Sequence, residues 1–244
     1  MAVALGKLLC RADAWVMALV YPRRTICLSC GGLSYGAPLC ERCAESLAES
    51  RVEGRLCPLC GHRVYSSWCV FCRGEVPGRM RSVWRHEGVA RRLVHQLKHG
   101  CIQECATILA EGMAACAGDF DLPPDTVVTW VTMPRRRRLE RGIDHSRVLA
   151  EAVATRLELP CRQLLTRKDE GRTQRGLSRA ERLRNLNGRF SCSDALAHPV
   201  LLVDDVLTTS ATVRVCAAEL LAAGATQVYI ITATQASLRL FSRD

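Results

Sequence analysis

The sequence contains no apolar run that approaches the roughly 20 residues a membrane-spanning helix needs. Its first 20 residues are apolar in places, but Lys7, Arg11 and Asp13 interrupt them, and no small-residue cleavage site is visible. These absences argue against a membrane span and against a secretory signal. We therefore expect a cytoplasmic protein in which residues 1–22 form a short amphipathic helix that ends at Pro22.

Aromatic and acidic residues are both scarce. Phe, Trp and Tyr make up 5% of the chain, and 34 Lys and Arg residues against 24 Asp and Glu residues give a formal net charge of +10. Such an excess favours acidic partners, either phosphorylated metabolites or nucleic acid. An arginine-rich surface without such a partner gives the same charge, so both interpretations stay open. No Ser, Cys or His nucleophile with an evident partner is visible, so covalent catalysis is not indicated.

Cysteine is abundant, and its spacing is informative. Eight of the fifteen cysteines form four Cys-x-x-Cys pairs, and each such turn can present two thiolates to one metal ion. Two consecutive pairs joined by a short loop would close a tetrahedral zinc site, and Gly31 and Gly61 suit the tight turns. We prefer this sequential arrangement, with cross-brace pairing as the alternative, and we expect structural sites. The predicted ligands are Cys27, Cys30, Cys40 and Cys43 for one zinc ion, and Cys57, Cys60, Cys69 and Cys72 for the other.

Composition divides the rest of the chain. Residues 23–78 hold all the cysteine pairs, and the Pro77-Gly78 turn marks the beginning of a second domain, residues 79–244. There, helical spacing over 88–99, 107–117, 145–157 and 211–223 alternates with short β-rich runs over 127–133, 200–203 and 228–232. Strands that alternate with helices predict an α/β fold with a parallel, Rossmann-like sheet and flanking helices. Residues 162–183 are polar and weakly periodic, which is typical of a mobile loop.

The segment Val200–Thr212 carries the most specific functional signal. An apolar strand ends in the adjacent carboxylates Asp204 and Asp205, and a hydroxyl-rich loop then leads into a helix. In open α/β sheets, ligands bind beyond the carboxyl ends of the strands, and the beginning of a helix attracts anions. The two carboxylates suit a ribose diol, and the loop suits a phosphate. The candidate binding residues are Asp204, Asp205, Val206, Leu207, Thr208, Thr209, Ser210, Ala211 and Thr212.

This segment closely resembles the signature with which type I phosphoribosyltransferases bind phosphoribosyl pyrophosphate (PRPP). Ser210 stands where that family usually has Gly, which would strain the loop if the position requires a positive φ. The segments RRLVHQLKHG from residue 91, VTMPR from 131, RGIDH from 141 and QRGLSRAER from 174, together with the cysteine pairs, extend the resemblance to the ComF family, GntX type. One departure is Ile143-Asp144-His145, where the family commonly has Phe-Asn-Gln.

The resemblance implies a phosphoribosyltransferase core that binds PRPP with magnesium, with Asp204 and Asp205 as the catalytic carboxylates. It also places Thr132, Met133, Pro134 and Arg135 against the pyrophosphate and makes residues 162–183 a flexible flap. Two functions follow. The first is an enzyme that transfers phosphoribosyl to an acceptor that the sequence does not identify. The second is a single-stranded-DNA-binding competence factor regulated by PRPP, associated with DNA uptake and with an uptake or helicase partner.

Basic segments bear on the second function. Arginine is dense over residues 135–147 and again over 162–189, and such clusters can contact a nucleic-acid backbone. Binders of single strands also need aromatic platforms for base stacking. Only Tyr65, Trp68, Phe71 and Trp84 gather in this sequence, near the cysteine pairs. A basic rim that faces only pyrophosphate remains the alternative.

Overall fold

The computed structural model of the chain describes residues 26–64, 69, 72, 76–100, 102–167 and 188–236. The expected helix over residues 1–22 and most of the expected flap lie outside these residues. Within the described part of the chain, no helix is both long enough and apolar enough to cross a membrane.

Contacts divide the chain into two units between Glu49 and Ser50. In the first unit, Ile26 and Leu33 form an antiparallel bridge that closes a knuckle, and helix α2 (Glu41–Glu49) follows. The side chains of Cys43 and Leu47 are one helical turn apart, and both are buried, so α2 has one packed face. The second unit holds the second cysteine quartet together with the whole α/β core. The predicted boundaries at residues 22 and 78 stay predictions.

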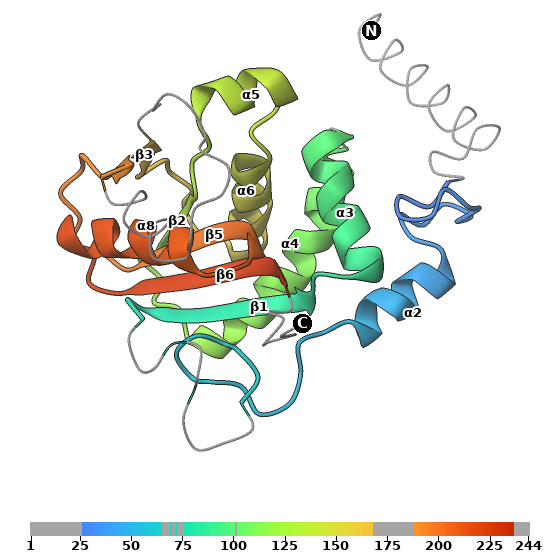
Figure 1. Cartoon of the computed structure of the whole chain (residues 1–244), viewed down its shortest axis with the longest axis horizontal. Helices are drawn as coiled ribbons and strands as arrows, with labels where there is room; N and C mark the ends of the chain where they lie inside the picture. The colour runs from blue at the N-terminus through green and yellow to red at the C-terminus, as the bar shows by residue number, and fades with distance from the viewer. Residues whose placement is uncertain are drawn as a thin grey trace, which may run out of the picture. The chain divides into compact units, whose positions relative to one another are not determined.

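The core is a four-stranded sheet in which every pairing is parallel (Figure 1). The α/β class with a parallel sheet is therefore confirmed. Its strands are largely buried, and three of the four are rich in Val, Ile and Leu, as expected for a sheet that is covered on both faces. The strands lie in the order β1 (Arg79–Arg85), β6 (Val228–Gln235), β5 (Val200–Leu207) and β2 (Val127–Trp130).

Helices pack on both faces of this sheet. Helix α8 (Ala211–Ala222) packs on one face with Val200, Leu202, Val228 and Ile230, which alternate along β5 and β6. The side chain of Tyr229 points to the opposite face, where α4 (Glu104–Ala117) packs, and its ring centroid lies 5.3 Å from that of Phe120. The helices that pack on the sheet are α3 (Gly88–His99), α4 (Glu104–Ala117), α6 (His145–Leu157) and α8 (Ala211–Ala222).

Sequence spacing located the helices well and the strand ends poorly. Helices α3 and α6 have the predicted bounds, α4 begins three residues earlier than expected, and α8 ends one residue earlier. Strand β5 was expected to end at Val203 but continues to Leu207, and β6 continues to Gln235. The spacing did not predict helix α2 or strand β1, an edge strand of the sheet. It also did not predict the 3-10 turn η1 (Gly118–Phe120), α5 (Arg135–Arg141) or the hairpin of β3 (Thr166–Arg167) and β4 (Phe190–Ser191).

Candidate functional site

The eight paired cysteines form two compact clusters. Cys27, Cys30, Cys40 and Cys43 make up one cluster and Cys57, Cys60, Cys69 and Cys72 the other, with all sulfurs of a cluster within 4.8 Å of one another. Tetrahedral zinc with Zn–S bonds of 2.3 Å would place its sulfurs about 3.8 Å apart. The Sγ–Sγ distances of 3.8 Å for Cys30–Cys40, 3.7 Å for Cys57–Cys72 and 3.5 Å for Cys60–Cys69 fit that spacing. The sequential arrangement is confirmed, and the clusters are consistent with two structural metal ions.

Backbone geometry supports the knuckles as the sequence predicted. Gly31 and Gly61 both have positive φ values, of 73° and 65°, which lets each turn fold back after its Cys-x-x-Cys pair. In the first cluster, the amides of Ser29 and Gly32 point at Cys27 Sγ and Cys30 Sγ, each at 3.4 Å. Amides that point at sulfur stabilise thiolates, the form in which cysteine binds a metal.

The second cluster is attached to the sheet. The Met80 amide donates to the Leu59 carbonyl at 2.7 Å, and Arg81 Nη1 donates to the Cys57 carbonyl at 3.3 Å. Gly61 lies so close to β1 that a Cβ there would come within 2.6 Å of the Met80 carbonyl oxygen. The second cluster therefore packs directly on strand β1.

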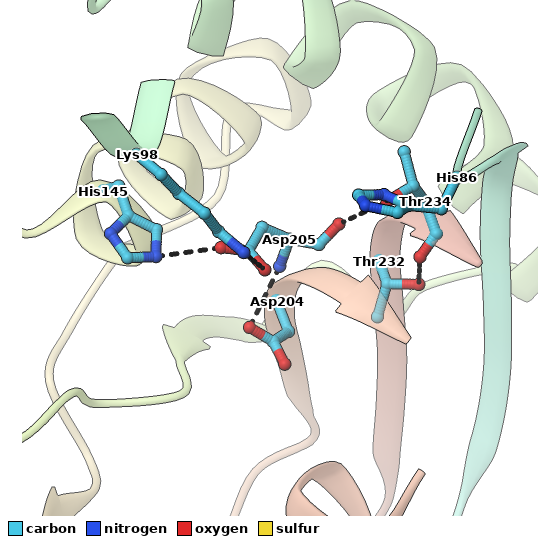
Figure 2. A network of polar contacts seen from close by, with 7 residues as sticks. All are labelled: His86, Lys98, His145, Asp204, Asp205, Thr232 and Thr234. Carbon is cyan, nitrogen blue, oxygen red and sulfur yellow. Dashed lines mark hydrogen bonds and ion pairs between the residues drawn. The ribbon is translucent and has the colours of Figure 1, made fainter. Parts of the chain in front are cut away.

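The two carboxylates that were expected beyond a strand lie within β5. Because side chains alternate along a strand, Asp204 and Asp205 point to opposite faces of the sheet. Figure 2 shows this divergence, with Asp205 directed toward Lys98 and His145 and Asp204 directed away from them. The two acids therefore have different environments, which the spacing alone did not reveal.

Asp205 is held by two side chains from separate helices. Lys98 Nζ, on α3, lies 2.7 Å from Asp205 Oδ1, and His145 Nε2, on α6, lies 2.9 Å from Asp205 Oδ2. Burial alone opposes ionisation of Asp205, but the hydrogen bond from His145 and the charge of Lys98 outweigh it and hold its pKa below the usual range. Asp205 is therefore an ionised, oriented carboxylate with little exposure.

Asp204 is the more available of the two acids. Its side chain is half-buried, and among the described residues its Oδ1 accepts one hydrogen bond, from the neighbouring amide of Asp205 at 3.0 Å. Burial and the charge of Asp205 raise the pKa of Asp204 to about 8, partly offset by Lys98. A carboxyl group with this pKa gains or loses its proton near neutral pH, so a ligand that needs the carboxylate competes with a proton there.

The loop after β5 turns sharply into α8. Thr208 is exposed and Thr209 is half-buried, so hydroxyl groups line the loop. Ser210, the residue before α8, has φ 57° and ψ 0°, in the left-handed region that favours glycine. Ser210 thus has the positive φ that would strain a residue other than glycine. Its Oγ donates to the Thr209 carbonyl at 2.6 Å. Val206, Leu207 and Ala211 have apolar side chains, so they contribute backbone groups and packing to this segment.

The segment after β2 reaches the same edge of the sheet, since β2 and β5 are paired in parallel. Thr132 is buried, and its Oγ1 has no hydrogen-bond partner among the described residues. A buried hydroxyl without a partner is costly and needs an explanation, such as a bound ligand or water. Met133 and Pro134 are half-buried, and the backbone of Arg135 begins α5.

Lys98 and His145 were not predicted as site residues. Lys98 is 107 positions before Asp205, and only the packing of α3 on β6 and β1 brings the two together. A signal for His145 was present, because it stands where the resembled family commonly has Gln. Histidine and glutamine can both donate a hydrogen bond to a carboxylate.

The basic and aromatic residues that were candidates for nucleic-acid contact differ in their exposure. Arg136, Arg137 and Arg138 are exposed on α5. Trp84, which was considered as a stacking platform, is 3% exposed and packs beside Gly112 of α4. Tyr65, Trp68 and Phe71 lie outside the described residues.

Comparisons with known proteins place the chain in a family. No family model matches it. It is 34% identical over 207 residues to the DNA utilization protein YhgH of Salmonella typhi and 30% identical over 205 residues to YhgH of Escherichia coli (strain K12). Each of these matches covers 79% of this chain and 88% of the relative.

Solved structures that match include glutamine PRPP amidotransferase from B. subtilis, with a TM-score of 0.37 and 22% identity over 53% of this chain and 26% of that one. Adenine phosphoribosyltransferase from Leishmania tarentolae matches with a TM-score of 0.33 and 12% identity over 55% of this chain and 71% of that one. By its likeness to the YhgH sequences, the chain belongs to the family of YhgH DNA utilization proteins, of the GntX/ComF type.

Proposed function

We propose that the protein binds magnesium PRPP at the carboxyl edge of β5 and transfers its phosphoribosyl group to an acceptor. The observation that carries this proposal is the unit formed by β5, the hydroxyl loop and α8, which presents Asp204 and the loop amides at one edge. The 5-phosphate would bind the amides and hydroxyls of residues 206–212. The buried hydroxyl of Thr132, which has no partner within the described ranges, would donate to the pyrophosphate, with Met133, Pro134 and Arg135 beside it in the chain.

Asp204 and Asp205 would have different roles in binding the sugar. Asp204, with its lone pairs largely unused, would accept hydrogen bonds from the ribose diol. Asp205 points to the other face, where Lys98 and His145 fix its orientation, so it would act on the sugar through its charge rather than by direct contact. Magnesium, which retains most of its own water and phosphate ligands, would neutralise the pyrophosphate charge. The protein then needs no nucleophile, because positioning and charge stabilisation supply the catalysis.

Zinc is our assignment for the two cysteine clusters, because four thiolates in tetrahedral spacing are its usual structural site. We also propose a cytoplasmic location, where thiols stay reduced; no disulfide joins the described cysteines.

Calorimetric titration of the zinc-loaded protein with magnesium PRPP tests the ligand assignment. We expect binding that is lost in the double variant Asp204→Asn, Asp205→Asn and kept in Asp125→Asn, which changes an exposed carboxylate elsewhere. Pyrophosphate release when nucleobases or DNA are added then tests for transfer. Normal binding by the double variant would overturn the diol assignment, and absence of binding by the wild type would overturn the proposal.

A second candidate is a competence factor that binds single-stranded DNA under the control of PRPP and acts with a DNA-uptake or helicase partner. The observation that favours it is the exposed arginine surface of α5, which begins directly after the segment Thr132–Pro134. Each lost phosphate contact lowers the slope of log affinity against log salt by about 0.7 for a single strand. Changing Arg136, Arg137 and Arg138 to Gln should therefore lower the slope by about 2, and an unchanged slope would exclude α5 as the contact.

A further inference from the structure

A second group of polar side chains lies at the carboxyl edge of β1 and β6, beside the proposed PRPP site. The His86 amide donates to the Gln235 carbonyl at 2.8 Å, so these two residues are neighbours at the ends of their strands. Gln235 is also paired with Leu207, the last residue of β5 before the hydroxyl loop. The edge therefore adjoins the proposed phosphate loop.

The hydrogen bonds of Thr234 determine which nitrogen of His86 carries a proton. Thr234 Oγ1 donates its only proton to the Asp205 carbonyl oxygen at 3.1 Å. The contact of 2.8 Å between Thr234 Oγ1 and His86 Nδ1 must then have the imidazole as donor (Figure 2). In a neutral ring, this assigns the proton to Nδ1 and leaves Nε2 with a free lone pair.

Charge around the ring favours this neutral state. Burial, together with the positive charges of Lys98 and Arg91 on α3, lowers the pKa of His86, while Asp205 opposes them. His86 is half-buried, and its Nε2 makes no hydrogen bond within the described part of the chain. The neutral imidazole thus presents an acceptor nitrogen whose direction Thr234 fixes.

Gln235 supplies the complementary group. Its Nε2 is buried and has no hydrogen-bond partner among the described residues. An unpaired amide in a buried position is costly, and a ligand that accepts its hydrogen bond would remove that cost. Within the part of the chain that the structure describes, one edge therefore carries an acceptor and a donor without partners.

We propose that His86 and Gln235 form the acceptor subsite, which recognises a planar group with an N–H donor beside a carbonyl oxygen. Nucleobases and carboxamides share this chemistry. The N–H donates to His86 Nε2, and the carbonyl accepts from Gln235 Nε2. This inference rests on the proposed transferase function, because it places the acceptor substrate beside the PRPP loop.

The test combines nitrogen NMR of the histidine side chains with ligand titrations on the full, zinc-loaded chain. At neutral pH, His86 should show an unprotonated Nε2 and a protonated Nδ1. Uracil should shift the His86 Nε2 signal. The analogue 1,3-dimethyluracil has no N–H and should not shift it. Nicotinamide tests whether a carboxamide is enough for binding. A protonated Nε2, or no shift with either uracil or nicotinamide in the presence or absence of magnesium PRPP, overturns the subsite.

Two substitutions at one position separate recognition from folding. His86→Asn can keep the donor to Thr234 but lacks an acceptor at the place of Nε2, so uracil binding should weaken at least tenfold. His86→Gln can offer an acceptor near that place and should retain part of the affinity, and exposed His95→Gln is the control. Equal binding by wild type and His86→Asn contradicts the subsite.

The PRPP arm separates the two proposals. If PRPP fails to bind but uracil still shifts His86, the transferase proposal fails and the subsite stands. If PRPP binds and no acceptor probe shifts His86, the subsite fails and PRPP binding stands.

Discussion

Replacing Lys98 with Met should destabilise the α/β unit far more than removing an ion pair at its surface. The Lys98–Asp205 and Arg147–Glu151 pairs both have N–O distances of 2.7 Å. Their exposures differ: the side chains are 22% and 8% exposed in the first pair and 59% and 47% exposed in the second. Arg147→Met therefore serves as a control that is matched in geometry and differs in burial.

The expected magnitude follows from the environment of Asp205. Removal of one partner from a buried pair costs about 3–5 kcal/mol because it leaves an uncompensated charge. Water reaches part of the Lys98 ammonium, and His145 still donates to the other oxygen of Asp205, so we expect about 2–3 kcal/mol. For a unit of this size, such a loss lowers Tm by roughly 5–10 °C. Arg147→Met should cost about 0–0.5 kcal/mol.

Urea unfolding of the four proteins of a double-variant cycle measures the coupling. Asp205→Asn removes the charge that Lys98 compensates, so the double variant Lys98→Met, Asp205→Asn should recover at least half of the loss. If Lys98→Met and Arg147→Met cost the same, the pair contributes no more than a surface contact, and the assigned burial of Asp205 is wrong.

Three further changes test other parts of the structure. Ser210→Gly relieves left-handed backbone strain of about 1–2 kcal/mol. The same change loses a hydrogen bond of about 1 kcal/mol and adds conformational entropy to the unfolded state, which costs about 0.5–1 kcal/mol. The free energy of unfolding in urea should therefore stay within about 1 kcal/mol of wild type, whereas Ser210→Val should lower it. PRPP affinity should rise with pH up to about 8 as Asp204 ionises, and Asp204→Asn, tested by calorimetry at pH 6 and 8.5, should abolish this rise. The same raised pKa means that Asp204 stabilises the folded protein most below pH 4 and that this contribution is lost as the pH rises through 8. Zinc content should fall from two ions to one in both Cys27→Ser and Cys57→Ser. Only Cys57→Ser should lower the Tm of the α/β unit, because its cluster packs on β1. Equal Tm values for the two variants would contradict a coupling between the second cluster and the sheet.

Local signals in the sequence were enough for the metal clusters and for most of the helices. Cys-x-x-Cys turns bring two ligands together within four residues, so the clusters needed only short loops to close. The apolar spacing of α3 and α6 gave their bounds because each helix buries one face. The ends of the strands were harder to predict. The strand that begins at Val200 continues through Asp204 and Asp205, two acidic residues that a sequence pattern takes as the end of a strand. Pairing with β6 keeps the backbone extended there.

The sequence by itself determined the parallel α/β class, the two cysteine quartets and the segment from Asp204 to Thr212 as the candidate binding loop. Only the tertiary structure decided that Asp204 and Asp205 point to opposite faces, and that Lys98 and His145 hold Asp205 while Thr234 orients His86. These contacts join residues that lie 60 to 148 positions apart, as in the 148 that separate His86 from Thr234. No local pattern encodes such pairs, because they form only when the sheet and its helices bring distant segments together.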